Sequence, residues 1–526
     1  MLTLIDTATE TVKQSLTTFV ENGLECNTDT LSGSLLSEVC AGLEQSLDAA
    51  GRAAFKSFVE QYDCQAERFQ HDGKTYRIKD KANHKRFLTV FGEVELKRRY
   101  YHCDKAGAGI VPLDIGWDMQ GERYAMPEVV ESVLWANAEL TPAKFEEFCT
   151  KMCRFKPSTA CIQDIIARDG TGMAAMLAAD KEGVACRGIQ VPDGTEIIVA
   201  SLDGANVLLR EKGVRRGRPA QRPGFKTPGH SISHATVGEQ EKASNTTPTC
   251  YKNAMVGSFS FYKQVDGVID IESKQEGIVP HRLSSIYCAR MPEDKAVGFK
   301  QEFEAIFNEV AGGLGSCGAG KNNKDGGDSS SELIKILLLD GARPLWNYVE
   351  NNPLFAGYMM LLDFFHGAEH LSYLAAALFG KDSKRSKSWY EDWRFKLKFE
   401  EGAVEGILRS AAYHSRKQCL TKSRRKDMER EQEFFKNNKA RMNYHEHIER
   451  GWPIGSGPVE AACKTIVKHR MCQSGMRWSR AGGANILALR VLCKSGHWRR
   501  AWQTYRSERW LNQPKPKPLK TPSIAA

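Results

Sequence analysis

Three acidic residues, far apart in the sequence, each lie where a rigid element is expected. Asp203 interrupts the apolar run of Ile197–Arg210 (IIVASLDGANVLLR), Asp340 ends the run of Leu333–Gly341 (LIKILLLDG), and Glu460 falls in the first turn of an expected helix. A carboxylate in a buried strand is costly unless it is paired, hydrogen-bonded or bound to a metal. Two hard cations roughly 4 Å apart, held by carboxylates, activate one oxygen and stabilise another in phosphodiester chemistry. The three acids therefore predict a phosphoryl-transfer site with two ions, Mg²⁺ or Mn²⁺, in which Asp203 bridges both.

Two alternatives to this interpretation remain at the level of the residues. Asp-Gly is common in turns, so each acid also fits a cap or turn position, and Asp193-Gly194 shows the same dipeptide with no chemistry attached. Asp363 also follows an apolar run, so it competes with Asp340 for the place of second acid. The spacing of the residues leaves both alternatives open.

The composition describes an ordinary globular protein with a basic balance. The chain has 526 residues, of which 41% are hydrophobic and 26% charged, and 74 basic against 64 acidic residues give a formal charge of +10. We expect no signal peptide, because the first residues are partly acidic and lack an apolar core, and no run of membrane-spanning length is present. The 15 cysteines form no CxxC pair, which indicates reduced thiols in a cytoplasm.

A basic hairpin is expected after an N-terminal helical region at 1–72. Phe87–Val90 and Val94–Tyr101 alternate in hydrophobicity around a turn at Gly92, which is typical of paired strands. The second strand carries Arg98 and Arg99 next to aromatic residues, a composition that suits phosphate contacts with stacking. A solvated strand with no partner explains the same pattern equally well.

Two capped helices follow the hairpin and complete an expected DNA-binding region at 73–185. Thr141 precedes Pro142, and Ser158 can cap a helix over Thr159–Arg168. A short turn between two helices fits a helix-turn-helix, whose second helix enters the major groove, but any helical hairpin gives this pattern.

The elements between 186 and 380 alternate in the order expected of an α/β core. Beyond the Asp203 strand, short strands, a helix and a further strand are expected at Ala235–Gly238, Val256–Tyr262, Ile286–Arg290, Val297–Val310 and Tyr358–Asp363. The segment 210–226 is too basic and too rich in glycine and proline for a core, and its Arg216-Gly-Arg218-Pro resembles peptides that lie in narrow minor grooves. A basic loop without groove preference is the alternative. The composition of 311–331 indicates a flexible linker.

The last third of the chain is expected to be mainly helical. A charged helical insertion occupies 381–450, anchored by Trp389, Trp393 and Phe395, and the core resumes at 451–498 with the Glu460 helix. A basic, mostly disordered tail is expected at 499–526. The Glu460 segment also carries three basic residues suited to the DNA backbone, Lys464, Lys468 and Arg470. Lys464 lies one turn after Glu460, so it can instead pair with that acid.

Four motifs together resemble a known family. They are SLDGANV at Asp203, LLLDGARPLW at Asp340, LDFFHGAEHL at Asp363 and His366, and IGSGPVEAACKTIVKHRMCQSGMRWSRAGGANILALR at Glu460. In these motifs the chain resembles DDE transposases of bacterial insertion sequences, from the branch related to Mutator-like elements. The resemblance covers about 80–500 but is dense only at the motifs.

The resemblance implies a fold, a reaction and partners. The fold is α/β: an RNase H-like catalytic core, a mixed sheet flanked by helices, with an all-helical insertion and a preceding α+β DNA-binding region. The catalytic triad is Asp203, Asp340 and Glu460, while Asp363 and His366 match the (Cys/Asp)-x-x-His motif near the site. Metal-dependent hydrolysis at transposon ends frees 3′-hydroxyls, which then attack target DNA. The partners implied are transposon ends, target DNA and further copies of the chain, without a membrane. The location implied is a bacterial cytoplasm, with the protein on the nucleoid. The paired cysteines of many relatives have no counterpart here, because Cys103 has no neighbour at ligand spacing.

Three other functions compete with transposition. His366-Gly-Ala-Glu369-His370 is a literal HxxEH, the motif of one class of zinc peptidases. A non-catalytic DNA-binding protein derived from a transposase would have the same motifs, and a plain nuclease would use the same site without joining strands. The three intact acids and the large DNA-binding region before residue 185 favour a transposase.

Overall fold

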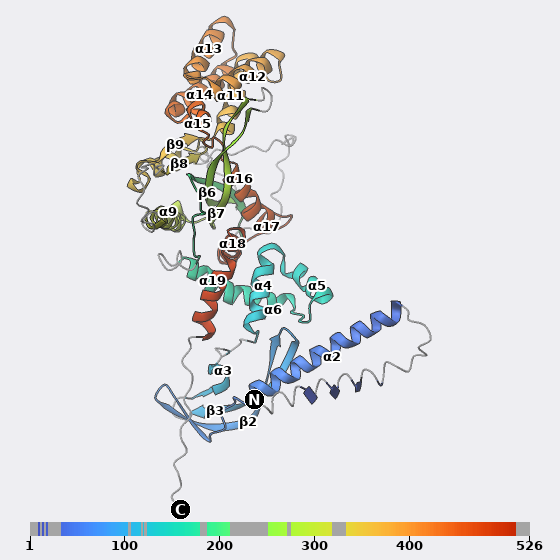
Figure 1. Ribbon diagram of the computed structural model, residues 1–526. Helices are drawn as coiled ribbons and strands as arrows, with labels where there is room; N and C mark the ends of the chain where they lie inside the picture. Colours follow the sequence, from blue (N-terminus) through green and yellow to red (C-terminus); the bar gives the residue numbers. More distant parts are fainter. Residues whose placement is uncertain are drawn as a thin grey trace, which may run out of the picture. The chain divides into compact units, whose positions relative to one another are not determined.

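The chain forms two compact units, which we describe separately (Figure 1). The computed structural model describes 33–103, 107–116, 124–178, 187–210, 251–270, 275–317 and 333–511, with residue 119 and isolated residues between 9 and 21. The terminal unit combines 1–176 with 498–526, and the central unit is 177–497. The chain therefore enters the central unit once and returns to the terminal unit at its end.

The terminal unit begins with a long helix and an antiparallel sheet. Helix α2 (Gly33–Glu60) packs on strand β3, and four strands follow in spatial order: β1 (Arg68–His71), β2 (Lys74–Thr89), β3 (Gly92–Cys103) and β4 (Ala108–Ile110). The hairpin expected around Gly92 is confirmed, with Thr89 paired to Gly92 and longer strands than the apolar runs indicated. Strand β1 lies within the region expected to be wholly helical, because Phe69 and Tyr76 pair across the sheet and pack on Tyr101.

Short helices complete the terminal unit. They are α3 (Pro112–Gly116), α4 (Pro127–Glu139), α5 (Pro142–Met152), α6 (Thr159–Ile165), a π-helix η1 (Ile166–Gly170) and α7 (Thr171–Ala178). Both expected caps are present: the side chain of Thr141 accepts from the N–H of Lys144, and that of Ser158 from the N–H of Cys161.

The last helix corrects the expected disordered tail. Helix α19 (Trp498–Arg506) and the π-helix η7 (Ser507–Leu511) are ordered parts of the terminal unit. Of the expected tail at 499–526, the part that lies outside the described residues is 512–526. The indole N–H of Trp498 donates to Glu131, and the hydroxyl of Tyr505 donates to the buried Asp169 at 3.1 Å. Apolar anchors among the basic residues explain the order: Ala501, Trp502 and Tyr505 are buried.

A five-stranded mixed sheet forms the centre of the central unit. In spatial order its strands are β7 (Gln275–Arg290), β6 (Tyr251–Asp270), β5 (Ile197–Leu208), β8 (Ile334–Leu339) and β9 (Met359–Leu362). Strands β5, β8 and β9 are parallel, whereas β6 is antiparallel to both of its neighbours. The expected mixed α/β architecture is therefore present, and the strands at Asp203, Val256–Tyr262, Ile286–Arg290 and before Asp363 are confirmed.

Helices cover both faces of this sheet. On one face the phenylalanines of α9 (Val297–Cys317) pack on Phe259, and Phe303 closes against Gly257. The neighbouring Val256 points to the other face, where it packs with helices of the C-terminal segment, because successive side chains of a strand alternate. That segment comprises α16 (Gly457–Ala462), the π-helix η6 (Cys463–Lys468), α17 (His469–Met471) and α18 (Arg480–Lys494).

The remaining helices of the central unit connect its strands and form the insertion. Those near the sheet are a 3₁₀ turn η3 (Asp294–Ala296), α10 (Arg343–Glu350), a second 3₁₀ turn η4 (Pro353–Phe355) and α11 (Phe364–Phe379). The expected helical insertion is confirmed as α12 (Lys384–Phe399), α13 (Ala403–Lys417), α14 (Lys422–Asn438), a 3₁₀ turn η5 (Lys439–Arg441) and α15 (Tyr444–Glu449). Trp389 is buried and Trp393 partly buried, but Phe395 is 55% exposed and is not an anchor.

Some expectations lie outside the described residues. They are the strand at 235–238, all but Arg210 of the basic segment 210–226, and the linker beyond Cys317, where α9 ends. Within the described residues, no helix is long and apolar enough to cross a membrane.

Candidate functional site

Asp203 and Asp340 lie at the same level of the central sheet. The parallel register pairs Ile197 with Ile334 and Ala200 with Leu337, so continuing it by three residues brings Asp203 opposite Asp340. The same continuation from the pairing of Leu339 with Leu362 sets Asp363 beside Asp340. Adjacent strands are about 4.8 Å apart, so three acids meet at one edge, where the carboxyl ends of parallel strands commonly form sites in α/β proteins.

Asp203 is held in a tight, partly buried environment. Its Oδ1 accepts from the N–H of Gly204 at 2.6 Å, and the thiol of Cys463 donates to the same carboxylate. A Cβ at Gly204 would lie 2.2 Å from the amide of Asn253, so the backbone approaches this side chain in a way that only glycine allows. Burial raises the pKa of Asp203, and the charges of Asp340 and Glu460 raise it further.

Glu460 reaches this site from a helix across the sheet. Helix α16 packs on β5 and β6 through Val459 and Ala462, and the adjoining η6 packs on β5. With Cys463 of η6, these residues share a core cluster with Ala205 and Val256. Glu460 of this helix is exposed, and the hydroxyl of Ser456 donates to its Oε1 at 3.3 Å. Because the charge of Glu460 raises the pKa of Asp203, the three acids expected from the sequence are electrostatic neighbours.

A buried arginine supports the segment after Glu460. The guanidinium of Arg490, which is fully buried, donates to the carbonyl oxygen of Ile466 at 2.6 Å and to that of Thr465. These carbonyls belong to the π-helix η6, whose wider turn leaves backbone groups without the usual helical partners. The arginine therefore supports the helix that carries Cys463 toward Asp203.

Asp340 and Asp363 have different surroundings. Asp340 is half-buried, and its Oδ1 accepts from the N–H of Ala342 at 2.9 Å. Asp363 is 2% exposed, and both of its oxygens are engaged by backbone, Oδ1 by the N–H of His366 at 2.7 Å and Oδ2 by the N–H of Ser456. This difference favours Asp340 as the second acid of the site.

His366 lies beside the acids, as the x-x-His motif indicated. A Cβ added to Gly341 would come within 2.9 Å of His366 Nε2, so the glycine after Asp340 makes room for the ring. Burial lowers the pKa of His366, the neighbouring His370 lowers it further, and the charge of Asp340 opposes this. A neutral imidazole at this place can donate or accept a hydrogen bond.

The HxxEH residues have partners of their own. His370 Nδ1 contacts the carboxylate of Glu431 at 2.5 Å, and its ring stacks on Phe434. Throughout the described residues, no three His, Cys, Asp or Glu side chains converge as a group that could hold a metal ion. This finding applies to the HxxEH residues and to the three acids alike, so the acids are neighbours and not a closed set of ligands.

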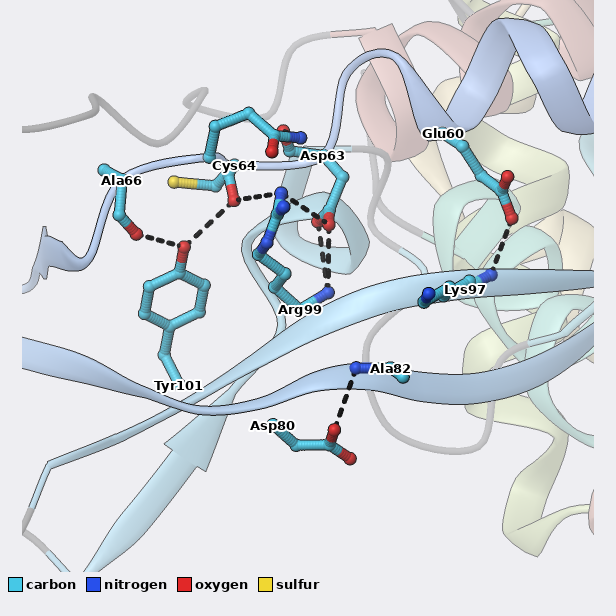
Figure 2. A network of polar contacts seen from close by, with 10 residues as sticks. Glu60, Asp63, Cys64, Ala66, Asp80, Ala82, Lys97, Arg99 and Tyr101 are labelled. Atoms are coloured by element: carbon cyan, nitrogen blue, oxygen red, sulfur yellow. Dashed lines mark hydrogen bonds and ion pairs between the residues drawn. The ribbon is translucent and has the colours of Figure 1, made fainter.

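The basic residues of the hairpin have partners inside the terminal unit. Arg98 is 4% exposed and forms an ion pair with Asp114 and a hydrogen bond with Asn83. Arg99 binds Asp63 and the carbonyl oxygen of Cys64, as Figure 2 shows. A buried, ion-paired guanidinium is not available to phosphates, which argues against Arg98 as a DNA contact. The side chain of Arg99 is 24% exposed, and its contact with DNA stays a prediction.

The other expected DNA contacts fall into three groups. Lys464 and Lys468 are exposed, and in the described part of the chain no ion pair joins Lys464 to Glu460. Arg470 is 2% exposed and lies 5.3 Å from the ring of Trp478, so its expected contact with DNA is replaced by a cation–π interaction inside the unit. Arg216 and Arg218 lie outside the described residues.

Cys463, Ser456 and Arg490 are the site residues that the sequence did not single out. Cys463 is three residues after Glu460 and Ser456 four before it, which is the spacing of one helical turn. That spacing was the available signal for both. Arg490 offered none, because a lone arginine in an apolar stretch is ordinarily read as a surface residue.

Comparison with known proteins gives one match. A model of an uncharacterised protein family, UPF0236, matches 30–186. This range begins just before α2, extends ten residues beyond the terminal unit's first segment, which ends at Met176, and contains none of the three acids. A search of curated proteins found no match.

Proposed function

We propose that the protein is a DDE transposase that binds transposon ends and catalyses metal-dependent strand cleavage and strand transfer. One observation carries the proposal. Asp203, Asp340 and Glu460, from three segments far apart in the sequence, are electrostatic neighbours at the carboxyl edge of the parallel strands. Nothing in the packing of an ordinary core requires three acids there, since each adds to the cost of burying the others' charge.

The architecture of the central unit supports an RNase H-like core. Its sheet is mixed and flanked by helices on both faces, and a helical insertion separates β9 and α11 from the helix of Glu460. This arrangement agrees with the fold that the transposase resemblance implies. The separate terminal unit, with its sheet and capped helices, is the proposed DNA-recognition part.

The donor chemistry of the site fits Mg²⁺ or Mn²⁺. All three candidate ligands are carboxylates, which hard cations prefer, and cation binding would offset the repulsion that raises the pKa of Asp203. Bound ions would supply Lewis-acid stabilisation of the attacking and leaving oxygens. Asp203, Asp340 and Glu460 would hold them, and the exposed Lys464 and Lys468 would bind the DNA backbone.

The proposed reaction has two in-line steps at this one site. In the first, a water oxygen attacks a phosphodiester at the transposon end, and the leaving oxygen becomes a free 3′-hydroxyl. In the second, that hydroxyl attacks target DNA, so one phosphodiester bond forms as another breaks. Two ends must be held together for this, which requires more than one copy of the chain on DNA, and the proposed location is the bacterial cytoplasm.

A strand-joining assay tests the function and the triad together. Purified protein is mixed with DNA from the flanks of its own gene, a target plasmid and Mg²⁺ or Mn²⁺. We expect metal-dependent joined products from the wild type and a loss of at least about 100-fold for Asp203→Ala, Asp340→Ala and Glu460→Ala, because each removes charge stabilisation at the reacting phosphate. Glu449→Ala, at the end of α15, is the matched control and should retain activity.

Each other outcome points elsewhere. Cutting without joining indicates a nuclease. Tight end binding with neither cutting nor joining in either metal indicates a non-catalytic DNA-binding protein derived from a transposase. Zinc-dependent peptide hydrolysis lost in His370→Ala would indicate the peptidase.

A further inference from the structure

Buried hydrogen bonds of Asp363 join the start of α11 to the segment before Glu460, and we call this connection, from Asp363 to Ser456, the latch. Asp363 Oδ2 accepts from the N–H of Ser456, while its Oδ1 accepts from the N–H of His366 and so caps α11. Beside it, the N–H of Phe364 donates to the carbonyl oxygen of Ile454 at 3.0 Å. Both partners of the latch are buried, Asp363 at 2% and Ser456 at 5% exposure.

The latch closes the base of the helical insertion. The chain leaves the core at α11, passes through α12–α15 and returns at Ile454, so the latch joins segments separated by the whole insertion. Gly455 fits closely here, since a Cβ would lie 3.0 Å from the ring of Phe365. The hydroxyl of Tyr444, on the last helix of the insertion, lies 3.5 Å from the carbonyl oxygen of Asp363.

A further hydrogen bond connects the latch to Glu460, one of the three acids of the proposed site. The backbone N–H of Ser456 donates to Asp363 Oδ2, and the hydroxyl of Ser456 donates to Glu460 Oε1 at 3.3 Å. At the other end, Asp363 directly follows β9, in register with the Asp340 level of β8. A single buried carboxylate thus connects the strand edge that carries Asp340 to the helix that carries Glu460.

We infer that Asp363 is a positioning residue of the site, which sets Glu460 against Asp340 through Ser456, and is not itself a metal ligand. This inference rests on the proposed function. Both oxygens of Asp363 are directed at backbone N–H groups, one from each side of the insertion. Without the latch, the position of Glu460 would depend on the orientation of a long insertion. Partners of this kind tune metal affinity by about 10–100-fold when they are removed.

Asp363→Asn separates positioning from ligation. Asparagine keeps one carbonyl oxygen, which is a good helix cap, and replaces the other acceptor by an NH₂ group that cannot accept from a backbone N–H. Ser456→Ala is the second variant, because it keeps the backbone N–H of the latch and removes only the hydroxyl on Glu460. Ser383→Ala removes the cap of α12, away from the latch, and is the matched control.

The first measurement is Mn²⁺ binding to the full-length protein by calorimetry and electron paramagnetic resonance, with thermal unfolding as the check of folding. We expect about 10–100-fold weaker Mn²⁺ binding in Asp363→Asn, a smaller shift in the same direction in Ser456→Ala, and no shift in Ser383→Ala. The second is the rate of DNA cleavage against Mn²⁺ concentration. High Mn²⁺ should restore Asp363→Asn to within a few-fold of the wild-type rate, whereas Asp340→Asn should stay inactive.

The outcomes distinguish the two proposals. Unchanged Mn²⁺ binding in Asp363→Asn, or a folded Asp363→Asn that no Mn²⁺ concentration restores while Asp340→Asn remains active, overturns the latch. If the wild type binds Mn²⁺ but neither cuts nor joins DNA, the proposed function is overturned. The latch is then decided by comparing Mn²⁺ binding in Asp363→Asn with that in the wild type. A wild type that binds no Mn²⁺ overturns both.

Discussion

At the scale of single residues, the contact between Cys463 and Asp203 gives the site a donor other than backbone. Cys463 is buried, and burial raises the pKa of its thiol, with the charge of Asp203 adding to the effect. The protonated thiol is therefore a permanent, if weak, hydrogen-bond donor, and its hydrogen bond opposes the rise in the pKa of Asp203.

Replacing this thiol should change metal binding according to whether a donor remains. We expect about tenfold weaker Mn²⁺ binding in Cys463→Ala, because Asp203 loses the contact that orients it, and a change of less than about threefold in Cys463→Ser. Calorimetric titration with Mn²⁺ checks both. Cys493→Ala, a half-buried cysteine of α18, controls for loss of a thiol. If Cys463→Ala and Cys463→Ser weaken Mn²⁺ binding equally, then the packing of Cys463, and not its hydrogen bond to Asp203, supports the site.

The sequence predicted that Asp203 and Asp340 lie close together, but it did not predict that Arg98 and Arg470 are buried. Asp203 and Asp340 were visible because a charge that ends or interrupts an apolar run is anomalous, and the register then places them side by side. Arg98 and Arg470 were interpreted as DNA contacts because the sequence does not show that the chain folds each of them against its partner, Asp114 in one case and Trp478 in the other. No local pattern distinguishes such an arginine from an exposed one.

At the scale of elements, α15 contains a buried histidine that should link stability to pH. His447 is 5% exposed and packs edge-on against Trp452. Burial lowers the pKa of His447 from 6.5 to about 4, against the opposing influence of Glu446 and a hydrogen bond to the backbone of Pro453. The folded protein therefore holds His447 neutral at pH values where the unfolded chain would protonate it.

The sign of the effect follows from proton linkage. Above about pH 6.5 His447 is neutral in both the folded and the unfolded state, and its contribution to the free energy of unfolding is fully present. This contribution is lost as the pH falls toward about 4, because the unfolded chain binds the proton first. The loss should reach about 3 kcal/mol at most for this one group. Urea unfolding between pH 7.5 and 4.5 measures it, and His447→Gln should flatten the slope. A variant with the wild-type slope would assign the acid sensitivity to other groups, of which His497 is the first to test.

Most elements of the central unit were predictable from the sequence, although β6 and β7 extend well beyond the predicted Val256–Tyr262 and Ile286–Arg290. The parallel strands β5, β8 and β9 are largely apolar because such strands are buried on both faces. The helices at Thr141 and Ser158 begin with side-chain caps. The π-helix η6 was not predictable, since its wider turn depends on Arg490 from another helix. Helix α19 was missed because its basic composition outweighs three apolar anchors.

At the scale of the whole molecule, the last helix makes the terminal unit discontinuous in sequence. Residues 498–526 belong with 1–176, so the unit is completed only when the end of the chain has been added. One of the contacts that join the two segments is polar and buried: Tyr505 donates to Asp169, which is 1% exposed and also binds Arg168. Gly172 permits this contact, because a Cβ there would lie 2.6 Å from the hydroxyl of Tyr505.

Breaking the contact should loosen the terminal unit and leave the central unit unchanged. Tyr505→Phe removes one hydrogen bond to a buried carboxylate, and we expect a loss of about 1–3 kcal/mol. Gly172→Ala should act in the same direction by displacing the ring, and Thr504→Ala, on the exposed side of α19, should change the stability by less than about 0.5 kcal/mol. Hydrogen exchange resolves the units: faster exchange in α6 and α7 with unchanged β5 and β8 is the expected pattern. If exchange accelerates equally in both units, they unfold together, and α19 then contributes to the stability of the whole chain and not to that of one unit.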